Sequence, residues 1–313
     1  MSNLDTLMRR QHERNIALIG NSHYMRDRVG SNVLPFVLDP AAGGELSGDQ
    51  VNALEALSIE AARTAVSSLA SLAEIGELDH LGGGLDIIPA LTMTVSMTDY
   101  EKIEYTIENA HCSIGYYSVL AAFGFIEQDH VVREFRRSLD IAGHVSWVPG
   151  GTQLNGGRLG VMIPTAAGQA LGKKAHFGDG SAVICHCGDA GWISGQALNG
   201  FNVADLHGAP MVFVMHRNGI QLSGSNKQIM DKDPRPVISA LGIELIEIES
   251  MHDTQALYGA YCQAFELAQK GRPAMIYPTG TTQNLKAFAE AWGIVDETTQ
   301  MAAANDVELD QDV

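Results

Sequence analysis

One carboxylate and one amide follow two apolar segments of the chain at matching points. Asp189 comes after the run Ser181–Cys187, and Asn218 comes after the run Pro210–His216. Each run is short and ends at a turn signature, which is typical of a buried strand. Asn218 follows Asp189 by 29 residues, a typical length for one crossover unit. The carboxyl ends of parallel strands meet at one edge of a sheet, so we expect these two side chains to converge there.

Two hard oxygens beside a helix N-terminus suit a magnesium ion that carries a phosphate. Mg²⁺ takes few ligands from a protein and completes its shell with substrate oxygens, and a helix N-terminus attracts anions. Residues 190–207 carry apolar side chains at helical spacing and supply the helix. We therefore predict a magnesium and phosphate site. The alternative is an ordinary strand-to-helix turn in which Asp189 caps the helix.

Strands alternate with helices along most of the chain. This order predicts one doubly wound α/β domain, with a mainly parallel sheet and helices on both faces. Further helices are expected over 51–75, 113–125, 159–174, 237–241 and 254–269, and further strands over 243–248 and 273–277. We assign residues 51–282 to the domain, 1–50 to an N-terminal arm or loop region and 283–313 to a C-terminal tail.

The composition excludes several classes of protein. With 313 residues, 45% hydrophobic and 18% charged, the chain can bury a large core. A net charge of −17 argues against nucleic acid and against an anionic membrane surface. The N-terminus has no apolar signal region and no window approaches a membrane span, so we expect a cytoplasmic protein. Four cysteines fit a reducing compartment.

The sequence Cys185-His186-Cys187 has the residue types of a metal cluster. On a strand, however, Cys185 and Cys187 share one face while His186 points to the other. We therefore favour buried small side chains over a zinc site at this position.

Three histidines stand in glycine-flanked loops just before helices, at His80, His111 and His144. A single loop histidine is usually only solvated. Imidazoles exchange protons near neutral pH, however, so these histidines could serve acid–base chemistry.

These segments together resemble the transketolase family of thiamine-diphosphate enzymes. Gly188-Asp189-Ala190 with Asn218-Gly219-Ile220 resembles its Gly-Asp-Gly and Asn signature. Four loops resemble family segments in the family's order: His80-Leu81-Gly82-Gly83, Asn109-Ala110-His111, Gly143-His144 and Gly157-Arg158-Leu159-Gly160. The resemblance covers about residues 55 to 280 and identifies the chain as a member of that family.

The resemblance implies roles for these residues. Mg²⁺ would be bound by Asp189, Asn218 and the backbone carbonyl of Ile220, with the diphosphate of thiamine diphosphate on the metal. Cofactor-binding residues would be His80, His111, Gly157, Leu159, Gly188, Asp189, Ala190 and Asn218. Catalytic residues would be His80, His111 and His144, of which His144 would contact substrate hydroxyls.

The chain also departs from the family pattern. Ala190 replaces the second glycine of the signature, and Ser194 stands where the family usually has Glu. Ser250-Met251-His252-Asp253 replaces Asp-Gly-His-Asp, and a late His-Gly motif is missing. These differences favour a specialised relative over an ordinary pentose-phosphate transketolase.

Transketolases continue with a pyrimidine-binding domain that completes the cofactor site. We expect that domain in a separate carboxyl-terminal subunit, within an α2β2 heterotetramer. The expected reaction transfers a two-carbon ketol unit from a ketose or 2-oxo acid to an aldehyde. Two alternatives stay open beside it. One is an E1-type 2-oxo-acid decarboxylase or dehydrogenase subunit, and the other is a non-catalytic transketolase-like partner protein.

Overall fold

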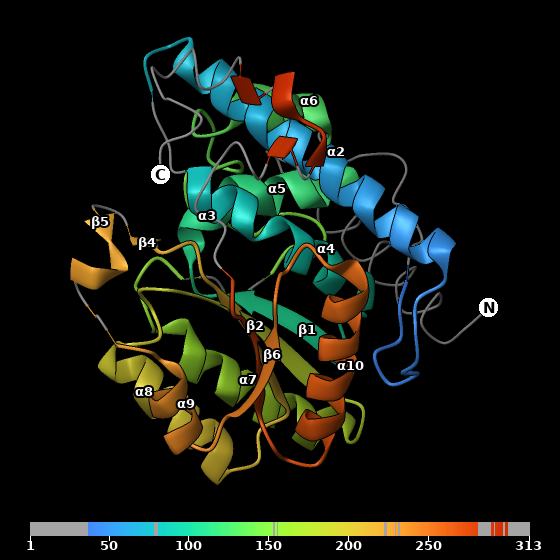
Figure 1. The fold of residues 1–313 in the computed structure, drawn as a ribbon, viewed down its shortest axis with the longest axis vertical. Coiled ribbons are helices and arrows are strands. Elements are labelled where there is room, and N and C mark those ends of the chain that lie inside the picture. The colour runs from blue at the N-terminus through green and yellow to red at the C-terminus, as the bar shows by residue number, and fades with distance from the viewer. Residues whose placement is uncertain are drawn as a thin grey trace.

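Parallel strands form the central sheet of the structure, which is a computed structural model. The structure describes residues 37–77, 81–152, 154, 156–221, 224–228, 230, 232–280, 289–290, 292–296 and 298–299. Its five strands lie in the order β1-β2-β3-β7-β6, and each neighbouring pair is parallel (Figure 1). The strands are β1 (Ile103–Ile107), β2 (Ala182–Gly188), β3 (Met211–His216), β6 (Glu244–Ile248) and β7 (Ala274–Pro278). A short antiparallel pair, β4 (Ile220–Gln221) and β5 (Gly224–Ser225), lies outside this sheet.

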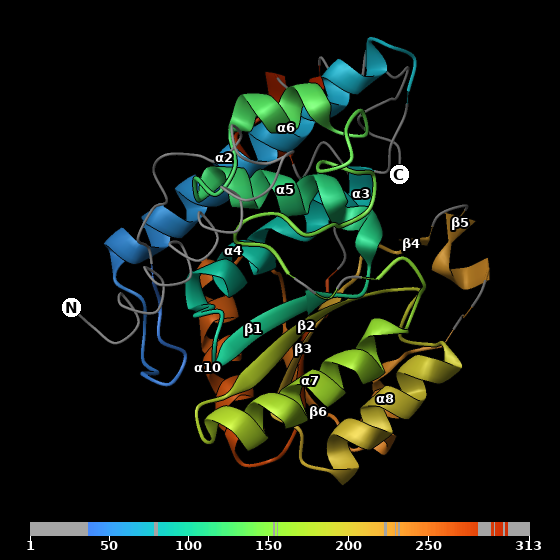
Figure 2. The same ribbon diagram turned by 180° about the vertical axis from the view of Figure 1, so that it is seen from behind.

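Helices cover both faces of the sheet, which confirms the predicted doubly wound α/β fold (Figure 2). One face carries α2 (Gly48–Ala73), α3 (Leu81–Asp86), α4 (Ile88–Met97), α5 (Ser113–Ala122), α6 (Gln128–Glu134) and α10 (Thr254–Gln269). The other face carries α7 (Met162–Phe177), α8 (Gly195–Leu206) and α9 (Arg235–Ala240). Two apolar cores result, one on each side of the sheet.

Strand β2 shows how the sequence divides between these two cores. Cys185 and Cys187 pack into the core beneath α7 and α8, with their sulfur atoms 3.9 Å apart. His186 points to the opposite face, where it contacts Thr94 of α4. The predicted alternation is therefore observed, and the three side chains do not converge on one point.

The helix boundaries follow local capping chemistry. The predicted helix over 254–269 is observed as α10, which begins after the cap Asp253. Helix α2 begins earlier than predicted, because Ser47 and Gln50 form a capping box. Strand β1 was not predicted from the sequence, and α7 begins three residues later than expected.

The domain limits proposed from the sequence stay a prediction. Trp292 and Ile294, within the segment assigned to the C-terminal tail, are 8% and 0% exposed and pack on the first core. Within the described residues, no helix is long and apolar enough to cross a membrane.

Candidate cofactor and metal site

The metal-binding segments predicted from the sequence meet at the carboxyl edge of the sheet. Gly188, the last residue of β2, pairs with His216, the last residue of β3. The backbone N–H of Gly219 donates to Oδ2 of Asp189 at 2.8 Å, so the turns after the two strands are in direct contact. Asn218 lies in this turn, with its amide nitrogen 4.0 Å from the position that a Cβ on Gly83 would take. Helix α3 and the turns after β2 and β3 therefore adjoin at one place.

Asp189 is not the cap of the following helix. The N-cap of α8 is Ser194, whose hydroxyl accepts from the N–H of Ala197 at 3.1 Å. The expected helix over 190–207 begins only at Gly195, so the predicted helix N-terminus directly after Asp189 was wrong. Ser194 stands where the resembled family usually has Glu. Its hydrogen bond gives it a structural role here, as the cap of α8.

Glu108 joins the loop of Gly160 to the end of β2, and sequence reasoning missed it. It is 1% exposed, directly after β1. Its Oε1 accepts from the N–H of Gly160 at 2.5 Å, and its Oε2 accepts from the N–H of Gly188 at 3.2 Å. A Cβ on Gly191 would overlap the same carboxylate, so only glycine fits there. Burial raises the pKa of Glu108, whereas the two backbone N–H groups lower it.

Two of the three predicted histidines contact each other. Nε2 of His111 and Nε2 of His144 are 3.2 Å apart, with the rings nearly perpendicular. The two loops are also joined through their backbones, because the N–H of Val145 donates to the carbonyl of Ala110 at 3.1 Å. His80 lies outside the described residues.

The remaining predicted residues lie around the same edge. The Gly156 N–H donates to the carbonyl of Ile107 at 3.0 Å and so fixes the loop of Gly157 beside the end of β1. Gly157 has open space where a Cβ would be, and the Leu159 side chain is 46% exposed. Ala190 follows Asp189 in a half-buried turn, and Ile220 begins β4.

Electrostatics favour a cation beside Asp189. Burial raises the pKa of its carboxyl group to about 6, and the nearby Asp86 adds to the increase. Hydrogen bonds from Asn226 and Gly219, together with the charge of Arg217, act in the opposite direction. A half-buried carboxylate of this kind gains from a metal ion, which offsets both its partial desolvation and the repulsion from Asp86.

Several buried polar atoms at this edge have no hydrogen-bond partner among the described residues, and they test whether the site fits a cofactor. They are Oδ2 of Asp86, Oδ1 of Asn109, Oδ1 of Asn226 and Nδ1 of His216. Buried polar atoms almost always have partners, so their gathering here fits a polar ligand. Among the described residues, no three His, Cys, Asp or Glu side chains group as a metal site. A single carboxylate with amide and carbonyl oxygens instead fits Mg²⁺ that also carries phosphate oxygens.

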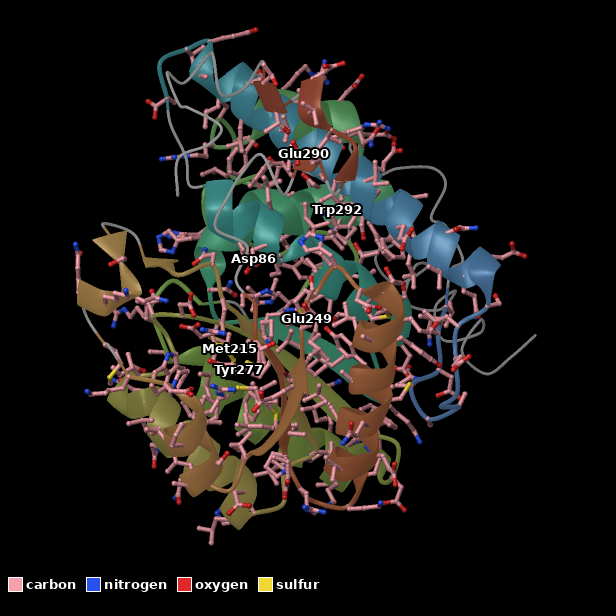
Figure 3. The ribbon with its side chains drawn as sticks, in the orientation of Figure 1. Asp86, Met215, Glu249, Tyr277, Glu290 and Trp292 are labelled. Carbon is pink, nitrogen blue, oxygen red and sulfur yellow. The ribbon has the colours of Figure 1, made fainter. Side chains whose placement is uncertain are left out.

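An open pocket of about 390 Å³ adjoins Asp189. Its lining includes the cationic side chains of Arg217, Lys227, Lys232 and Arg235. Arg217 donates to the carbonyl of Pro278 at 2.9 Å and lies over the ring of Tyr277. In the view of Figure 3, Asp86 of α3 lies above Met215 of β3 and Tyr277 of β7.

Comparison with known proteins shows which families this part of the chain resembles. Residues 152–277 match the family model of the dehydrogenase E1 component. The alpha chain of the pyruvate dehydrogenase E1 component of Bacillus cereus is 34% identical over 124 residues, which are 39% of this chain and 33% of that protein. The A component of the apulose-4-phosphate transketolase of Actinobacillus succinogenes is 28% identical over 141 residues, 43% of this chain and 49% of that protein. The match thus spans half or less of each relative.

Solved transketolases share the fold. A transketolase variant from Pichia stipitis superposes with a TM-score of 0.61 at 18% identity, covering 80% of this chain and 44% of the other. The Leishmania mexicana transketolase gives 0.61 at 18% identity, with 81% and 42% covered. The family matches, the shared fold and the converging signature segments agree with one another. Over the matched segments the chain is therefore similar to the transketolase-like and E1 alpha-chain proteins, and it shares the fold of the transketolases.

Proposed function

We propose that this chain is the diphosphate-binding subunit of a two-subunit transketolase-like enzyme. The reaction would move a two-carbon ketol unit from a ketose or a 2-oxo acid to an aldehyde. The observation that carries the proposal is the contact between the turns of Asp189 and Asn218, beside the loops that Glu108 holds.

Asp189, the Asn218 side chain and the Ile220 carbonyl would bind Mg²⁺ and, through it, the diphosphate of thiamine diphosphate. Asp189 provides the charge, and its contact with the Gly219 N–H orients the carboxylate. Gly157, Leu159, Gly188 and Ala190 would line the cofactor, since their loops surround the same edge. The bound cofactor supplies the carbon that adds to substrate carbonyl groups and the ring that takes up the electron pair.

The histidines are the proposed proton carriers. His111 and His144 share one hydrogen bond, so one ring presents an N–H and the other a bare nitrogen. Such a pair can accept or release a proton at a substrate oxygen. His80 is proposed to act beside them, as its loop precedes Gly83, which faces Asn218.

A second candidate is the alpha chain of a 2-oxo-acid dehydrogenase E1 component. The family model over residues 152–277 and the Bacillus cereus relative favour it. The histidine pair favours ketol transfer, because sugar hydroxyl and carbonyl oxygens require proton carriers.

A separate carboxyl-terminal subunit is part of the proposal. Its support is that both relatives are named as one lettered subunit of an enzyme, which implies at least one further component. We propose an α2β2 assembly with the cofactor at the interface between the two kinds of subunit.

An activity comparison separates the candidates. The chain, mixed with its carboxyl-terminal partner, thiamine diphosphate and Mg²⁺, is assayed with hydroxypyruvate or ketose phosphates and an aldehyde. The ketol transferase forms a lengthened ketose, whereas an E1-type enzyme decarboxylates pyruvate and reduces a dye instead. Under ketol transfer, His80→Ala spares cofactor binding and lowers turnover. Cofactor binding without either activity would contradict both candidates.

A further inference from the structure

A line of buried polar side chains runs from the candidate site into the core. Nε2 of His216 lies 2.8 Å from Nδ1 of His186, and Nε2 of His186 lies 3.0 Å from the hydroxyl of Thr94. The Thr94 hydroxyl lies 2.8 Å from that of Tyr261, which donates to the carbonyl of Ala90 at 2.9 Å. We call these residues, from His216 to Ala90, the His186 relay.

The His186 relay joins four elements of the fold. His216 ends β3, His186 lies in β2, Thr94 in α4 and Tyr261 in α10. Each of these side chains is at most 4% exposed. A polar chain in an apolar core is costly unless its members satisfy one another, so its hydrogen bonds hold these elements in one arrangement.

The backbone carbonyl at the inner end sets the direction of the hydrogen bonds. A carbonyl can only accept, so Tyr261 gives its single hydroxyl hydrogen to Ala90. The Thr94 hydroxyl then donates to Tyr261, and its oxygen accepts from Nε2–H of His186. Burial lowers the pKa of His186, which favours the neutral ring with one N–H. Nδ1 of His186 is therefore bare and accepts from Nε2–H of His216.

We propose that the His186 relay runs in this one direction and positions the turn that carries Asn218. Its residues act through His216, two places before Asn218, and are positioning residues rather than catalytic ones. Nδ1 of His216 lies 3.6 Å from Oδ2 of Asp86, beyond hydrogen-bond distance, so the ring is held from the His186 side. The positioning role rests on the proposed function, whereas the direction of the hydrogen bonds does not.

The direction is tested by nuclear magnetic resonance on the full chain without metal or cofactor. Long-range proton–nitrogen correlations of ¹⁵N-histidine-labelled protein distinguish protonated from bare ring nitrogens, and His186→Gln and His216→Gln assign the two signals. The proposal predicts that His186 is protonated at Nε2 and bare at Nδ1. A proton on Nδ1 of His186 would overturn it.

Two substitutions at Thr94 form a matched pair. Thr94→Val keeps the branched shape but removes the acceptor of the His186 N–H, so the His186 proton should move to Nδ1. The His216 proton should then move from Nε2 to Nδ1, which faces Asp86. Thr94→Ser keeps the hydroxyl and should keep the wild-type tautomer. An unchanged His186 tautomer in Thr94→Val would overturn the relay.

The positioning role is tested by calorimetric titration of thiamine diphosphate with Mg²⁺, in the presence of the carboxyl-terminal subunit. Thr94→Val should weaken cofactor binding roughly tenfold, as expected when a supporting group behind a metal ligand is lost. Thr94→Ser keeps the hydroxyl group and should bind the cofactor with the affinity of the wild type. Equal affinity in both variants, with a changed tautomer in Thr94→Val, overturns the positioning role alone. Absence of binding in the wild type overturns the proposed function and the positioning role, while the tautomer still decides the direction.

Discussion

The carboxylate of Asp189 is placed to bind a metal ion, but its charge destabilises the fold when no metal is bound. Partial burial raises the pKa of its carboxyl group from the ordinary value of 3.8 to about 6. A raised pKa means that the carboxyl group stabilises the fold at low pH, and that this contribution is lost as the pH rises through about 6. At neutral pH, the metal-free protein therefore holds a destabilising charge.

We expect Asp189→Asn to raise the free energy of unfolding of the metal-free protein by about 1–3 kcal/mol more at pH 7 than at pH 4.5. Urea unfolding in the presence of a chelator measures this difference. Asp179→Asn, at an exposed position, is the control and should show no such change. The same Asp189→Asn variant, and Asp189→Ala, should lose Mg²⁺-dependent cofactor binding. Wild-type binding in Asp189→Ala would remove the metal assignment.

Glu108 gives a second prediction at the scale of the residue. Glu108→Gln keeps the shape but turns one acceptor into an N–H donor that faces the N–H of Gly160 or Gly188. The free energy of unfolding should fall by about 1–3 kcal/mol, the cost of a buried unsatisfied group. Chemical denaturation measures it, with the exposed Glu127→Gln as the matched control. Equal losses in both variants would show that the carboxylate does not organise these loops.

At the scale of elements, the packing of α7 on α8 depends on a residue without a side chain. A Cβ on Gly200 would lie 2.6 Å from the backbone nitrogen of Pro164. Gly200→Ala should therefore destabilise the fold by about 1–3 kcal/mol through overpacking. Gly259→Ala, in α10 with open space around the added methyl group, should instead stabilise it by about 0.5–1 kcal/mol. Thermal unfolding of both variants measures the contrast, and two shifts of the same sign would contradict this packing.

The elements and contacts that could be predicted from the sequence were those that local patterns determine. Asp189 and Asn218 could be brought together because a strand–helix–strand unit fixes where parallel strands end. Strand β1 was missed because glutamates flank and interrupt its short apolar pattern, and the missing strand concealed Glu108 behind it. The face of His186 followed from the period of a strand, but its partners Thr94 and Tyr261 come from distant helices that no local pattern joins to it.

At the scale of the whole molecule, the described edge would supply one side of the proposed cofactor site. The net charge of −17 contrasts with the four cationic side chains that line the pocket beside Asp189. The same lining includes Asp189 and Asp233, and Arg235 pairs with Asp233, so the local positive charge that could favour an anion comes from Arg217, Lys227 and Lys232. The relatives named as subunits support a second chain that completes the site.

The most direct test of the proposed function is a calorimetric titration of thiamine diphosphate with Mg²⁺ into this chain, first alone and then mixed with a carboxyl-terminal transketolase-like subunit. We predict that binding appears or becomes tighter in the mixture and that Asp189→Ala abolishes it. No binding in either case, with the two chains shown to associate, would contradict the proposed function and indicate a non-catalytic partner protein.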